Sequence, residues 1–301
     1  MDRSDALSPA AALARDISER PKRRNAILRL RKRTLVSLAI LGIAILAAAF
    51  ANVLSPHDPS HASVLDGMTA PQWVGGEYIF GTDQIGRDIL SRLLFGIRTS
   101  LLVGSSAVIL SACVGILLGL TSGYAGSIVE FVIMRIVDSM MSVPGILVVM
   151  VLAFVLDPGV RTTIIALGAV GWVTYARMSR AEVKVVNSQP YILAARSMGC
   201  SPIRIAARHT FPNIANSLVV LSILQFGGAV VAEAAISFLG FGVQSPGSSL
   251  GIMLSDGRAF IGVAWWLPFF PAATIFIIVL CLNLCGEGLQ DWLDPVRRRR
   301  G

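Results

Sequence analysis

The stretch YILAARSMGCSPIRIAARHTFPN, residues 191–213, decides how this chain is organised. It is basic and rich in alanine, and it separates apolar runs on either side. Two short helix-prone runs meet at the turn-forming residues Gly199-Cys200-Ser201-Pro202. Pro212 then opens the next apolar run, where proline suits the first turn of a helix. A compact helix-turn-helix held at one side of a membrane is a structure that a partner protein can push or pull.

The composition is that of an integral membrane protein. Of the 301 residues, 54% are hydrophobic and 15% are charged, whereas soluble domains average about 25% charged residues. The net charge is +8, and the basic residues cluster beside apolar runs. This distribution indicates membrane orientation and argues against nucleic-acid binding.

Six apolar runs are long enough for spanning helices, each of which needs about 20 apolar residues. They cover residues 34–54, 99–122, 131–156, 160–178, 214–239 and 267–289. Backbone polar groups must be hydrogen-bonded inside a bilayer, so we expect helices throughout. The prediction is an all-α membrane protein with six transmembrane helices in one domain, residues 34–295, between a basic N-terminal segment, 1–33, and a basic tail, 296–301.

The distribution of lysine and arginine predicts the orientation. If the N-terminus is cytoplasmic, all but five of the 26 basic residues fall on the cytoplasmic side. Lysine and arginine are enriched in cytoplasmic loops, so we expect both termini and the loop 190–213 on that side. The long loops 55–97 and 240–266 are then external.

Few polar groups lie inside the predicted spans. Asp138 follows Arg135 by three residues, which predicts an ion pair along one helix. Glu233 lies among small residues and is either a pore or subunit-interface group or a buried, hydrogen-bonded support. Asn283 is a candidate bridge between helices. We interpret His57 and His61 as part of a solvated loop, with no metal bound.

The segment 80–101 predicts an amphipathic helix that enters the second span. Thr82 or Asp83 is a candidate N-cap. Arg87, Asp88 and Arg92 are expected to pair on its wet side.

Four segments occur in an order that carries a family resemblance. They are GTDQIGRDILSRLLFGIRTSLLVG (81–104), YILAARSMGCSPIRIAARHTFPN (191–213), AEAAISFLGFGVQSPGSSLGIMLSDGR (232–258) and NLCGEGLQDWLDP (283–295). From about Thr34 to Pro295 the chain resembles the C-type permease subunit of dipeptide, oligopeptide and nickel ABC importers. The resemblance implies a type I ABC importer permease fold and a pore for short peptides.

Permeases of this kind carry the loop pattern Glu-Ala-Ala, three residues, Gly, nine residues, Ile, one residue, Leu-Pro. The resemblance implies that the loop 190–213 is the coupling helix for the ATPase, and the residues it assigns to coupling are Tyr191, Ala194, Ala195, Gly199, Arg204, Arg208 and Pro212. Leu193 stands where the pattern has Glu, His209 where it has Ile, and Phe211 where it has Leu. A polar contact from that Glu is therefore absent.

The resemblance also implies the partners. They are two ATPase subunits, a second (B-type) permease and an extracytoplasmic binding protein, in a bacterial inner membrane. The sequence has no Gly-rich phosphate loop with Lys-Ser/Thr, so we expect ATP and Mg to bind the partner subunits and this chain to be non-catalytic and without a cofactor. The alternatives are the same machinery with nickel or another small solute, and a stand-alone secondary transporter, for which we find no inverted repeat.

Overall fold

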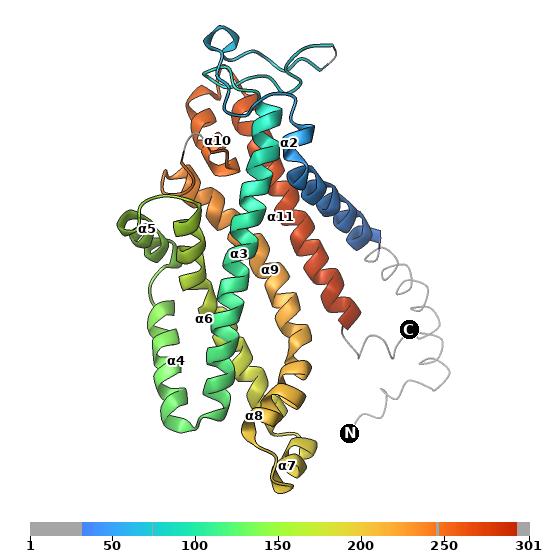
Figure 1. The fold of residues 1–301 in the computed structure, drawn as a ribbon, viewed down its shortest axis with the longest axis vertical. Coiled ribbons are helices and arrows are strands. Elements are labelled where there is room, and N and C mark those ends of the chain that lie inside the picture. The colour runs from blue at the N-terminus through green and yellow to red at the C-terminus, as the bar shows by residue number, and fades with distance from the viewer. Residues whose placement is uncertain (1–31, 74, 245–246, 294–301) are drawn as a thin grey trace, which may run out of the picture.

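The computed structural model describes residues 32–73, 75–244 and 247–293, which form an elongated array of helices (Figure 1). The elements are a helix at 32–49, α2 (Ala51–Leu54), η1 (Val64–Asp66), α3 (Ile89–Tyr124), α4 (Ser127–Met141), α5 (Gly145–Val155), α6 (Val160–Asn187), α7 (Pro190–Ser197), α8 (Pro202–Ile205), η2 (Ala206–Thr210), α9 (Phe211–Phe238), α10 (Leu250–Gly257), η3 (Arg258–Phe260) and α11 (Trp266–Leu293). The predicted tail 296–301 and nearly all of the predicted segment 1–33 lie outside the described residues.

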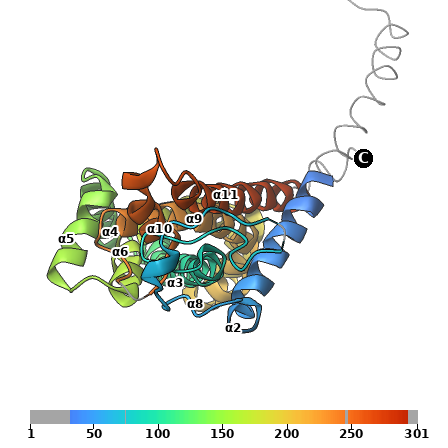
Figure 2. The same cartoon turned by 90° about the horizontal axis from the view of Figure 1, so that it is seen from above.

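Long helices make the body of the molecule, and α3 packs against α6, α9 and α11. Viewed from above, α4 and α5 lie at one side of this group and helix 32–49 lies at the other (Figure 2). Small residues permit the closest contact: a Cβ on Gly115 of α3 would lie 2.3 Å from the Trp172 carbonyl oxygen of α6. Such close approach is typical of helices packed within a membrane.

The described residues contain four helices long and apolar enough to cross a bilayer: 32–49, α3, a continuous helix from Pro202 to Phe238, and α11. The predicted span 131–156 is different from the expected single helix. It consists of α4 and α5, which are bent by 88° across the break before Gly145. Pro144 lies at that break, and proline cannot continue a helix because it lacks the N–H and its ring collides with the preceding turn. A fifth span results if this bent pair counts as one.

The predicted helix at 80–101 and the second span form one helix, α3, which begins later than predicted and has a different cap. It begins at Ile89 and runs for 36 residues, or about 54 Å. The predicted caps Thr82 and Asp83 are wrong, because the N-cap is Asp88, whose side chain accepts a hydrogen bond from the Ser91 amide at 2.9 Å. Residues 82–88 form a loop instead. α6 also continues to Asn187, beyond the predicted end at residue 178.

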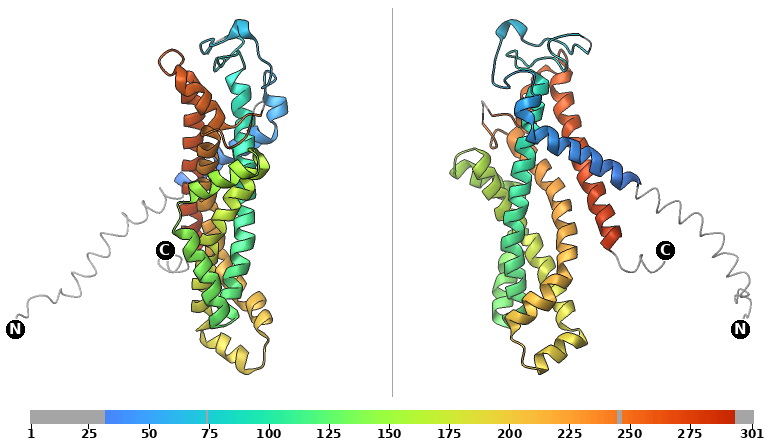
Figure 3. Two further views of the ribbon diagram at one scale, coloured as in Figure 1. Left: turned by 90° about the vertical axis from the view of Figure 1, so that its left-hand side faces the viewer. Right: turned by 45° about the vertical axis from the view of Figure 1, so that its right-hand side comes forward.

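The two ends of the molecule differ. The loop 55–88 and α10 gather at one end, and α7 and α8 project from the opposite end (Figures 1 and 3). The segment 190–213 is therefore separated from the loop 55–88 by the length of the long helices. This is the separation that the charge distribution predicted for an internal and an external loop.

Candidate functional site

The segment 190–213 folds as a short helical hairpin whose turn depends on a glycine. Gly199 ends α7 with a φ of +80°, and no atom lies within 4 Å of the position of an added Cβ. Backbone conformation, not space, therefore favours glycine here. After the turn, the Ser201 hydroxyl caps α8 by accepting a hydrogen bond from the Arg204 amide at 3.4 Å.

The inner face of the hairpin is attached to the long helices. Ile192, Ala195 and Ile205 are buried together. They pack against Tyr124 at the end of α3 and Val186 near the end of α6. A hydrogen bond between the hydroxyls of Tyr124 and Thr210 adds a second connection. The hairpin is therefore packed directly against the ends of α3 and α6.

The outer face of the hairpin is apolar and basic. Met198 is 76% exposed and Ile203 is 83% exposed. Arg196, Arg204 and Arg208 are exposed, and within the described residues none of them has an ion-pair partner. The sequence from 190 to 213 contains no acidic residue. Such a surface suits a partner that offers an apolar groove with acidic groups.

The residues assigned to coupling all lie in this hairpin, but the two alanines differ. Ala195 is buried against the long helices, whereas Ala194 is exposed. The Tyr191 hydroxyl accepts a hydrogen bond from the Asn213 side chain at 3.1 Å. Gly199 forms the turn, and Arg204 and Arg208 lie on the outer face.

A π-turn that the sequence did not predict joins the hairpin to α9. Residues 206–210 form η2, in which the Phe211 amide donates to the Ala206 carbonyl. Pro212 follows within the continuous helix Pro202–Phe238, and it has no N–H to donate to the Arg208 carbonyl. The wider turn accommodates this missing bond, and π-turns of this kind often mark functional positions. The signal in the sequence was a proline inside a helical run.

Glu233 forms the centre of a buried polar cluster. Its side chain is fully buried in α9. Oε1 accepts hydrogen bonds from Ser237 at 2.8 Å and from Ser249, the N-cap of α10, at 2.7 Å. Oε2 accepts one from Ser100 of α3 at 2.6 Å. These contacts are those of a hydrogen-bonded support that joins three helices, and a pore or interface role for Glu233 remains a prediction.

Asn283, the other interior candidate, lies on α11 and is exposed. Its side chain lies beside α9, because a Cβ atom added to Gly227 of α9 would be 3.4 Å from the Asn283 Oδ1. Its role between helices or subunits remains a prediction.

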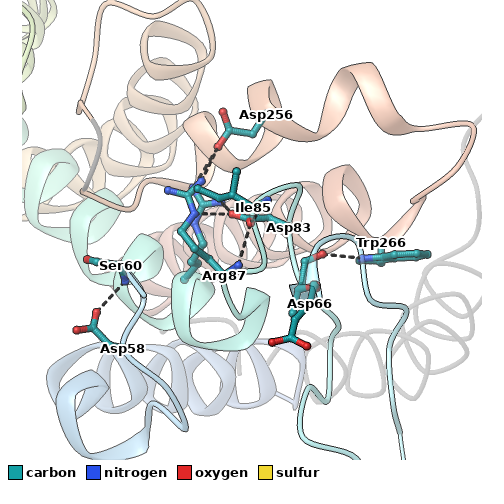
Figure 4. A network of polar contacts seen from close by, with 10 residues as sticks. Asp58, Ser60, Asp66, Asp83, Ile85, Arg87, Asp256 and Trp266 are labelled. Carbon is teal, nitrogen blue, oxygen red and sulfur yellow. Dashed lines mark hydrogen bonds and ion pairs between the residues drawn. The ribbon is translucent and has the colours of Figure 1, made fainter. Parts of the chain in front are cut away.

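An ion network connects the loop 82–88 with α10 (Figure 4), at the opposite end of the molecule from α7 and α8 (Figure 1). Asp83 Oδ2 accepts from Arg87 Nε at 2.6 Å and from Arg92 Nη1 at 2.5 Å. Both guanidinium groups also reach Asp256 of α10, at 3.5 Å from Arg87 and 3.2 Å from Arg92. Arg92 is only 2% exposed, so the expected pairing on a wet surface is wrong. Asp83 and the two arginines are buried, Asp256 is partly exposed, and the network joins α3, the loop 82–88 and α10.

The predicted Arg135–Asp138 pair is also wrong. Asp138 accepts from Arg177 of α6 at 2.6 Å, and the Arg135 guanidinium lies over the Phe131 ring instead, 5.1 Å from its centre. Glu130 similarly pairs with Arg180 of α6. These ion pairs hold α4 against α6.

The comparisons with known protein families and with individual proteins agree on one family. Residues 115–299 match the family described as binding-protein-dependent transport system inner membrane component. The di/tripeptide transport system permease protein DppC of Pseudomonas aeruginosa (strain UCBPP-PA14) is 38% identical over 267 residues, which are 88% of this chain and 88% of the relative. The oligopeptide transport system permease protein OppC of Bacillus subtilis (strain 168) is 37% identical over 300 residues, which are 97% of each chain.

One solved structure has a similar fold. It is an inward-facing conformation of the MetNI methionine ABC transporter, with a TM-score of 0.56 and 18% sequence identity. The match covers 66% of this chain and 94% of that chain. At this level of identity the likeness concerns the fold alone.

Proposed function

The chain belongs to the family of binding-protein-dependent transport system inner membrane components, and we propose that it is the permease subunit of an ATP-driven importer of short peptides. It is a multi-pass membrane protein. The observation that carries the proposal is its identity of 35–38% to curated peptide permeases over most of the chain. In this proposal the chain forms half of a translocation pore, and a second, B-type permease forms the other half.

The hairpin α7–α8 is the part of this chain that couples transport to ATP. An ATPase groove receives Met198 and Ile203, while the three arginines face acidic groups at its rim. ATP binding draws the hairpins of the two permeases together, and Tyr124 and Val186 pass this movement to α3 and α6. The pore then opens towards the binding protein, and hydrolysis returns it to the inward-facing state. Because Leu193 replaces the acidic residue of the loop pattern, docking depends on apolar and arginine contacts.

The proposed assembly supplies what this chain lacks. Two ATPase subunits bind ATP and Mg and carry out the hydrolysis, so this chain is not itself catalytic and binds no cofactor. A binding protein outside the membrane delivers the peptide. The chain crosses a bacterial inner membrane six times with both termini in the cytoplasm, α6 being one crossing and the bent pair α4–α5 another. The charge distribution and the opposite positions of the hairpin and the loop 55–88 support this orientation.

Reconstitution tests the proposal. The chain is co-purified with its partner subunits, placed in proteoliposomes with the binding protein, and supplied with ATP and labelled di- and tripeptides. ATP-dependent peptide uptake is the expected result. Uptake of a nickel chelate without peptide uptake would assign the alternative cargo. Uptake by this chain alone, driven by an ion gradient, would show that it is a secondary transporter.

A further inference from the structure

A cleft of about 270 Å³ lies between α3, α5, α6 and α9, where α5 bends away from α4. Its lining is apolar and contains many small side chains. The residues that line it on α9 are Gln225, Gly228, Ala229, Ala232 and Ile236, and those on α3 are Ala107, Val108 and Ser111. No atom lies within 4 Å of a Cβ built on Gly228, so this wall is open.

Three polar side chains line the cleft, and two of them are already hydrogen-bonded. Ser111 donates to the Gly168 carbonyl at 3.4 Å, and Tyr175 donates to the Ser222 hydroxyl at 3.0 Å. Gln225 has no hydrogen-bond partner among the described residues. It lies in the middle of α9, which spans residues 211–238. The Gln225 side chain is half-buried, and its amide is accessible from the cleft. The amide is therefore free to hydrogen-bond a polar occupant of the cleft.

We propose that this cleft is part of the translocation path, and that the Gln225 amide hydrogen-bonds the main-chain peptide group of a passing peptide. The inference rests on the proposed function. A glutamine amide carries one acceptor oxygen and two donor hydrogens. A peptide group offers one N–H and one C=O, which complement them. An acyl chain of a lipid has neither group and leaves Gln225 without a partner.

The rest of the lining fits a cargo of varied sequence. The wall on α9 presents small side chains, which leave room for different peptide side chains, and no charged residue lines the cleft to select a charged one. A single neutral hydrogen bond contributes little net free energy. A bond of this strength orients the peptide in the cleft but does not prevent its release. Transport requires both.

The test compares a dipeptide with the same dipeptide methylated on its peptide nitrogen. ATP-dependent uptake is measured with the full complex in proteoliposomes, at saturating loaded binding protein, for the natural chain and for Gln225→Leu. The readout for each chain is the uptake rate of the unmethylated dipeptide divided by that of the methylated one. The binding protein affects this ratio equally in both chains. If methylation removes one hydrogen bond, it is expected to lower the uptake rate of the natural chain by about 2- to 10-fold more than that of Gln225→Leu. Equal ratios in the two chains would overturn the proposal while leaving peptide import intact.

A second variant tests the cleft independently of Gln225. Gly228→Leu is expected to lower the uptake rate of a dipeptide with two bulky side chains more than that of a dipeptide of glycine and alanine. Val219→Leu, on the same helix but outside the cleft lining, is the control and is expected to leave both rates unchanged. If Gly228→Leu slows neither peptide, the cleft faces lipid and the inference is wrong. If the natural complex imports no peptide at all, the proposed function itself fails.

Discussion

Replacement of Glu233 tests whether the buried cluster is a hydrogen-bonded support or a site that needs a charge. The carboxylate accepts three hydrogen bonds from serine hydroxyls on three different helical elements. Each such bond contributes about 1 kcal/mol net, so Glu233→Ala is expected to lower the free energy of unfolding by at least about 3 kcal/mol. The cavity left by the side chain adds to this cost.

Glutamine at the same position predicts a very different result. Among the described residues only Ser100 binds Oε2, and an amide nitrogen placed there donates to the Ser100 oxygen instead of accepting from it. The amide oxygen keeps the bonds from Ser237 and Ser249. Glu233→Gln is therefore expected to cost less than about 1 kcal/mol. Ser249→Ala is expected to cost more than Ser100→Ala, since Ser249 also caps α10, a contribution of about 1 kcal/mol.

Thermal unfolding of the purified chain in detergent measures these differences. Cys281 and Cys285 are buried in α11, so a fluorogenic thiol reagent reports their exposure. A background with Cys113→Ser and Cys200→Ser removes the exposed and the half-buried thiol. Midpoints are compared at one scan rate, because unfolding of such proteins is commonly irreversible. If Glu233→Gln unfolds at as low a temperature as Glu233→Ala, the charge itself is required and the support interpretation is refuted.

Three other predictions follow from the structure. Gly199→Asp is expected to insert into the membrane normally and to abolish peptide-stimulated ATP hydrolysis. The control is Gly126→Asp, at a glycine with a φ of +90° outside the hairpin, and it is expected to retain this hydrolysis. Equal ATPase activity of the two variants would contradict the coupling role. Arg92→Met removes the more buried arginine that binds Asp83 and is expected to destabilise the chain by about 3 kcal/mol. The same thiol assay measures this, and an unchanged midpoint would show that Arg87 alone suffices. Asp138→Asn breaks an exposed ion pair and is expected to change the free energy of unfolding by less than about 1 kcal/mol; a larger loss in that assay would mean that the α4–α6 pairs act together.

The sequence predicted the helical class, the approximate positions of most spans and the hairpin at 190–213. These features depend on local chemistry, because apolar runs determine which segments enter a bilayer. Glycine and proline likewise interrupt helices through their own backbone properties. The break before Gly145 was the exception. Pro144 was visible in the sequence, but the surrounding residues are as apolar as those of an uninterrupted span.

Long-range contacts decided the remaining features. Ser100 and Glu233 are 133 residues apart, and Arg92 and Asp256 are 164 residues apart. No local pattern encodes which of these side chains meet, because their partners depend on how the helices pack. For the same reason Asp138 pairs with Arg177 across two helices. The sequence alone therefore determined approximately where most helices form and where the hairpin turns. The tertiary structure decided which buried polar groups are hydrogen-bonded, and it leaves Gln225 facing an open cleft with no hydrogen-bond partner among the described residues.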